Sequence, residues 1–108
     1  MSKRILAIGA HADDGVFWCG ATLLKAAEKG HAVHYLSLTK NVSDQQINAM
    51  TTLCGEYGLG FQTLGYASQS LVVDLPTKRA VAAAIAAFRP DIALVMWPHD
   101  LNQDHCLA

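Results

Sequence analysis

Short apolar runs alternate along the chain with segments in which apolar residues recur every three or four positions. The runs are residues 3–9, 32–38, 61–65 and 91–97, and glycine or polar residues bound them. Apolar runs of this length, rich in β-branched and aliphatic residues, predict buried strands. The last run, DIALVMW, is continuously apolar, which predicts a fully buried central strand.

The segments between these runs have the spacing of amphipathic helices. Helices are predicted over residues 21–29, 45–57 and 77–88. In the second of them the apolar residues share one face, and we expect this face to belong to the core: Ile47, Met50, Leu53, Cys54 and Tyr57. Residues 66–74 have no clear period and predict a loop over the ligand-binding edge of the sheet.

A strict alternation of strand and helix predicts an α/β, Rossmann-like three-layer fold with a parallel sheet. If the third strand lies outside the second and the fourth crosses back, the strand order is 3-2-1-4. The first and fourth strands are then neighbours. The crevice between their carboxyl ends is the point where such folds bind ligands.

Composition narrows the function classes. The chain is 52% hydrophobic, with 8 Lys and Arg against 9 Asp and Glu and a formal charge of −1, which argues against a nucleic-acid partner. No apolar run approaches the ~20 residues of a membrane span, and the amino terminus does not read as a signal peptide, so a cytoplasmic protein is expected. The cysteines have no CxxC spacing and predict buried thiols rather than disulfides or a thiolate zinc site: Cys19, Cys54 and Cys106.

Polar residues follow the first predicted strand directly. His11, Asp13 and Asp14 come within five residues of Gly9 in the sequence GAHADDG. A neutral imidazole and a carboxylate on one short loop are a ligand pair suited to zinc. Asp13 would then remain beside the metal as a carboxylate that is not a ligand. The alternative is structural, because an aspartate at this position, taken alone, is more often a helix cap than a ligand.

A second polar cluster follows the fourth predicted strand. Residues 98–105, PHDLNQDH, are richer in His and Asp than turn formation requires. His105 could complete a facial His-Asp-His set with His11 and Asp14. Such a set leaves positions open for water and substrate, as in catalytic rather than structural zinc sites. The two clusters together favour a metal site.

The paired motifs AHADDG and PHDLNQDH resemble those of the PIG-L or LmbE-like family of zinc-dependent de-N-acetylases, A-H-P-D-D-E and P-x-D-x-H-x-D-H. The resemblance spans the chain in order and spacing. It implies that His11, Asp14 and His105 bind Zn²⁺ or another divalent metal. It also implies that Asp13 is the general base and Asp104 the carboxylate beside the last ligand.

The chain departs from the family pattern at Ala12, Gly15 and Asn102, where proline, glutamate and histidine are usual. An amide at residue 102 can donate a hydrogen bond to an oxyanion but cannot deliver a proton. The family implies removal of an N-acetyl group from a small-molecule amino sugar or glycoconjugate of the N-acetylglucosamine type. Whether the protein forms a homo-oligomer stays open. Family members continue for about as much chain again, so we expect residues 1–108 to be the amino-terminal portion of one deacetylase domain.

Other functions compete with this interpretation. Paired acidic residues after a first strand also hold Mg²⁺ in receiver-like binding modules, but magnesium prefers oxygen ligands and would leave the histidines unexplained. A dinucleotide-binding domain is less well supported, because GAHADDG is not GxGxxG. An inactive fragment of the deacetylase is a further alternative. A metal titration separates the deacetylase, for which we expect tight zinc binding, from the receiver-like module, for which we expect binding of magnesium alone.

Overall fold

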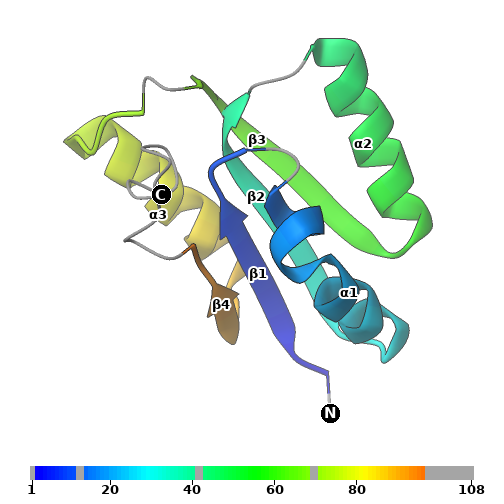
Figure 1. Cartoon of the computed structure of the whole chain (residues 1–108). Coiled ribbons are helices and arrows are strands. Elements are labelled where there is room, and N and C mark those ends of the chain that lie inside the picture. Colours follow the sequence, from blue (N-terminus) through cyan, green and yellow to red (C-terminus); the bar gives the residue numbers. More distant parts are fainter. Residues whose placement is uncertain (1, 12–13, 41–42, 69–70, 97–108) are drawn as a thin grey trace.

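The computed structural model describes residues 2–11, 14–40, 43–68 and 71–96, in which strands and helices alternate strictly (Figure 1). In chain order the elements are β1 (Arg4–Gly9), α1 (Asp14–Glu28), β2 (Ala32–Lys40), α2 (Asp44–Glu56), β3 (Leu59–Ala67), α3 (Leu75–Phe88) and β4 (Ile92–Leu94).

The strands form one parallel sheet in the order β3-β2-β1-β4. The predicted α/β fold and the predicted strand order are therefore confirmed. β1 lies between β2 and β4, so its backbone is hydrogen-bonded on both sides. From β1 the sheet continues through β2 and β3 on one side, whereas β4 lies on the other side of β1. The carboxyl end of β1 is therefore the topological switch point of the sheet.

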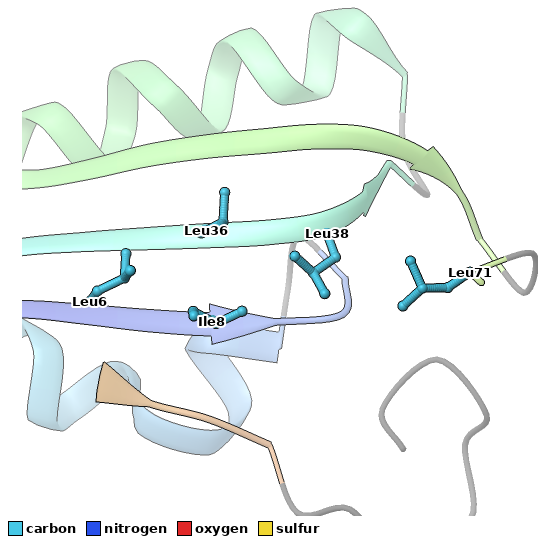
Figure 2. Close-up of a cluster of buried hydrophobic side chains, with 5 residues drawn as sticks. All are labelled: Leu6, Ile8, Leu36, Leu38 and Leu71. Carbon is cyan, nitrogen blue, oxygen red and sulfur yellow. The ribbon is translucent and has the colours of Figure 1, made fainter. Parts of the chain in front are cut away.

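The two faces of the sheet carry separate hydrophobic clusters, because successive side chains of a strand point to opposite faces. One cluster faces α3 and consists of Leu6, Ile8, Leu36, Leu38 and Leu71 (Figure 2). The other faces α1 and consists of Ala7, Leu23, Val33 and Tyr35. α3 contributes partly buried residues to the first cluster, whereas α1 contributes them to the second.

Local sequence signals set the helix ends. Ser43 caps α2 through a capping box with Gln46, and Asp74 caps α3 by accepting a hydrogen bond from the Thr77 N–H. This hydrogen bond also lowers the pKa of the Asp74 carboxyl. α1 begins at Asp14 rather than at residue 21, so the predicted start was wrong. Gly15 and Gly20, which are poor helix formers, obscured the first turns of the pattern.

The prediction of a fully buried central strand over residues 91–97 was wrong. β4 is only three residues long, and Ile92 is 43% exposed and Val95 69% exposed. Among the described strands β4 pairs with β1 alone, at the edge of the sheet. An apolar run specifies a strand, but its burial depends on how many neighbours that strand has. Trp97 lies outside the described residues.

The predicted core face of α2 was also wrong. No residue of α2, which the structure describes throughout, is buried, and Leu53 is 54% exposed. Met50, Leu53, Cys54 and Tyr57 instead line one wall of an apolar cavity of about 400 Å³, and α1 with the sheet forms the rest. Cys54 is half-buried there, and burial raises the pKa of its thiol, as expected for a packing residue.

The loop predicted over residues 66–74 begins later than expected, because β3 continues to Ala67. Within this loop Leu71 is buried and joins the cluster that faces α3. None of the helices in the described part of the chain is long and apolar enough to cross a membrane.

Candidate active site

His11 lies just beyond the carboxyl end of β1, where the chain turns toward α1. It is 8% exposed, one of few buried polar residues in the described part of the chain. β2 pairs with β1 as far as Gly9, whereas β4 pairs with it only from Ile5 to Ala7. Because so little of its surface is exposed, the His11 imidazole lies in surroundings with little water, where electrostatic interactions are stronger than in bulk solvent.

Two residues of β2, Tyr35 and Thr39, hold the backbone of residues 10–11 through hydrogen bonds. The Thr39 N–H and the Thr39 hydroxyl both donate to the Ala10 carbonyl, at 2.8 and 2.6 Å. The Tyr35 hydroxyl donates to the His11 carbonyl. Tyr35 and Thr39 are themselves buried. Consecutive carbonyl groups are thus anchored to the neighbouring strand at the position where the candidate ligand begins.

The segment that follows β4 approaches the same place from the other side. The Ala10 N–H donates to the Met96 Sδ at 3.2 Å. Met96 is the last described residue before residues 98–105, which contain the second polar cluster. The fold therefore brings the chain that leads to that cluster against the backbone of the first one, as the strand order requires.

The structure describes some of the predicted site residues and not others. His11 is described in full, and Asp14 is the first residue of α1, three residues further on, with only its backbone described. Asp13, Asn102, Asp104 and His105 lie outside the described residues. Their predicted roles, and the convergence of three ligands, therefore stay predictions.

The donor chemistry available at this edge fits a metal of the zinc type. Imidazole nitrogen and carboxylate oxygen are both common zinc ligands, and His11 stands at a buried strand end. No three His, Cys, Asp or Glu side chains gather at one point within the described residues. A set of three metal ligands would therefore have to include side chains outside the described part of the chain.

Two further histidines lie away from this edge. His31 precedes β2, at the opposite end of the sheet, and its Nδ1 accepts a hydrogen bond from the Lys3 N–H at 2.9 Å. His34 stacks on the Phe88 ring of α3, with 5.3 Å between ring centroids. Lys40, by contrast, ends β2 at this same edge of the sheet, and it forms an ion pair with Asp44 at the start of α2.

Sequence reasoning missed Tyr35 and Thr39, which support the candidate site from β2. A signal was present, because alternate positions of this strand carry hydroxyl groups, at Tyr35, Ser37 and Thr39. With a strand period of two, these groups share one face. Buried polar groups are almost always hydrogen-bonded, so hydroxyl groups repeated on one face of an otherwise apolar strand predict specific hydrogen-bond partners on that face.

Solved structures share the fold over nearly all of this chain. A conserved protein from Thermus thermophilus is 26% identical, with a TM-score of 0.84 over 98% of this chain and 51% of its own. The N,N'-diacetylchitobiose deacetylase from Pyrococcus horikoshii is 19% identical, with a TM-score of 0.84 over 98% of this chain and 46% of its own. The 4-carboxy-2-hydroxymuconate hydratase GalB from Pseudomonas putida KT2440 is 20% identical, with a TM-score of 0.83 over 98% and 52%.

The chain thus spans about half the length of the structures that it matches. A deacetylase and a hydratase share this architecture, so the fold alone does not determine the reaction. No curated protein sequence matches the chain significantly. The sequence model of the PIG-L family, described as GlcNAc-PI de-N-acetylase, matches residues 6–108. Because this match takes in almost the whole chain, the protein belongs to the PIG-L family.

Proposed function

We propose that this chain carries the metal-binding and catalytic residues of a metal-dependent de-N-acetylase. The observation that carries the proposal is the buried His11 at the carboxyl end of β1, followed at once by the start of α1 at Asp14. Membership of the PIG-L family supports the same reaction class. In this proposal His11, Asp14 and His105 hold Zn²⁺.

Bound zinc would polarise the amide carbonyl of the substrate and lower the pKa of a water molecule toward neutrality. The Asp13 carboxylate accepts the proton of the attacking water, and the protonated carboxyl returns it to the amide nitrogen as the C–N bond breaks and the amine leaves. The Asn102 side-chain N–H donates to the amide oxygen as negative charge develops on it. Asp104 supplies a carboxylate beside His105, where it can orient the imidazole.

The proposed substrate class is a small molecule with an N-acetylated amino sugar, such as an N-acetylglucosamine conjugate. The family is described by a GlcNAc-containing substrate, and the similar Pyrococcus horikoshii enzyme is named for a diacetylated disaccharide. A receiver-like magnesium module is not favoured, because in the flavodoxin-like order β1 lies between β2 and β3 rather than beside β4. A cytoplasmic location stays a prediction.

The first test is a zinc titration of the wild-type chain, His11→Ala and His31→Ala, each with acetate release measured on an N-acetylglucosamine conjugate. We expect His11→Ala to abolish zinc binding and deacetylation. His31→Ala is the matched control, because this histidine lies at the opposite end of the sheet. Binding of magnesium but not zinc by the wild type would contradict the proposal, as would unchanged zinc affinity in His11→Ala.

The roles of the adjacent aspartates are separated by Asp13→Asn. If Asp13 is the general base, this variant keeps its zinc stoichiometry and loses roughly 10²–10⁴-fold in turnover. Asp14→Asn should instead lose metal and activity together. A parallel loss of zinc and activity in Asp13→Asn would show that the two roles had been assigned the wrong way round.

A further inference from the structure

The contact between Tyr35 and the backbone of His11 brings the Tyr35 side chain unusually close to the backbone of Gly9. A Cβ atom built on Gly9 would overlap the Tyr35 hydroxyl oxygen and lie 3.0 Å from the ring carbon Cζ. The Tyr35 side chain therefore passes directly over Gly9 to reach the His11 carbonyl. Glycine at this position leaves the space that the phenol occupies.

The strand register explains why this tyrosine reaches the loop. Tyr35 is paired with Ala7, and Gly9 is paired with Ser37, two residues further along each strand. Side chains two residues apart share a face, so the tyrosine ring lies diagonally across the pair and its hydroxyl extends past the end of β1. The Tyr35 hydroxyl thus donates a hydrogen bond to the His11 carbonyl, which lies just beyond the last residue pair of β1 and β2.

We propose that Tyr35 is a positioning residue for His11, which it orients through the His11 carbonyl. This inference rests on the proposed function, in which His11 is a metal ligand. The peptide unit of His11 determines where its side chain begins, and Tyr35 fixes that unit against the rigid pair of β1 and β2. Groups that orient a ligand typically change metal affinity 10–100-fold when they are removed.

Tyr35 also has a packing role, which the test must separate from positioning. Its ring stacks on Phe61, with 5.9 Å between centroids, and lines the cavity between α1 and α2. Tyr35→Phe keeps the ring and removes only the hydroxyl. Tyr66→Phe is the matched control, because Tyr66 is a half-buried tyrosine on the neighbouring strand that packs against the cluster on the α3 side.

The experiment is a zinc titration of the whole chain against a competing chelator, for the wild type, Tyr35→Phe, Tyr66→Phe and His11→Ala. We expect Tyr35→Phe to weaken zinc binding about tenfold, since it acts on the ligand through the backbone, with Tyr66→Phe close to the wild type. Wild-type affinity in Tyr35→Phe, with affinity lost in His11→Ala, overturns the positioning role and leaves the proposed function in place. Unchanged affinity in His11→Ala overturns both.

A double variant tests whether Gly9 and Tyr35 act through the same contact. Gly9→Ala should displace the phenol and weaken zinc binding as much as Tyr35→Phe does. The double variant Gly9→Ala with Tyr35→Phe should then be no weaker than either single variant, because the contact is already lost. Losses that multiply in the double variant would show that Gly9 and Tyr35 act independently, and would contradict the proposed mechanism of positioning.

Discussion

The two faces of the sheet are filled in different ways. The face toward α3 is packed with large aliphatic side chains, among them Leu6, Leu36 and Leu38, all of them buried (Figure 2). The face toward α1 and α2 carries smaller residues such as Ala7 and Val33 and holds a cavity of about 400 Å³. The first face is filled by aliphatic side chains, whereas the second combines an unfilled cavity with the hydroxyl groups that anchor the candidate site.

This difference shows that stability and site support come from opposite sides of the same strands. On β2, Leu36 faces the packed cluster, and its neighbour Tyr35 faces α1 and holds the His11 backbone. Substitutions on the α3 side should therefore act mainly on folding. Substitutions on the α1 side can act on the site while the fold persists.

The largest contrast should come from leucine truncations on the two sides. Leu36→Ala removes a side chain that is 0% exposed, and should lower the free energy of unfolding by about 2–5 kcal/mol. Leu53→Ala truncates a half-exposed leucine beside the cavity and should cost less than about 1 kcal/mol. Urea denaturation of both variants measures the difference. Similar losses would mean that α2 is packed as tightly as β2.

Filling the cavity should give a smaller effect of opposite sign. Ala21 is an exposed residue of α1 that lines the cavity. Ala21→Leu should raise the free energy of unfolding by about 0.5–1 kcal/mol, because apolar atoms enter unfilled apolar space. Ala83→Leu is the control for helix propensity, because Ala83 is an exposed alanine within α3, away from the cavity. Equal changes in the two variants would argue that the cavity does not accept a side chain.

The smallest expected effect is a pH dependence of the free energy of unfolding, caused by His34 on the α3 side of the sheet. Burial against Phe88 lowers the pKa of His34, and a hydrogen bond with Gln62 partly opposes this shift. The unfolded chain, with an ordinary histidine pKa of about 6.5, then binds more protons than the folded chain. The free energy of unfolding should therefore fall as pH drops from about 6.5 toward the lower folded pKa.

Removal of the imidazole tests this dependence. His34→Gln cannot titrate, so its free energy of unfolding should change less with pH across that window than the wild-type value. Denaturation midpoints measured at several pH values between neutral and mildly acidic check this expectation. Identical profiles for the two proteins would show that His34 does not contribute to the pH dependence.

The sequence by itself determined the parts that depend on local patterns. The alternation of apolar runs and helical spacing predicted the parallel sheet, and the helical spacing placed α2 and α3 within two residues of their observed ends. The motif around His11 predicted a polar residue at the carboxyl end of β1, where the structure describes a buried histidine. These features follow from the period of each element and from turn chemistry, which neighbours in sequence decide.

Only the tertiary structure decided burial and the contacts between strands. Helical spacing in α2 identified its apolar face but not whether another element covers it, and the apolar run of β4 did not reveal its place at the edge. The pairing of Tyr35 with the His11 carbonyl depends on the register of β1 and β2 and on the space above Gly9. Register and coverage arise from residues far apart in the chain, so no local pattern encodes them.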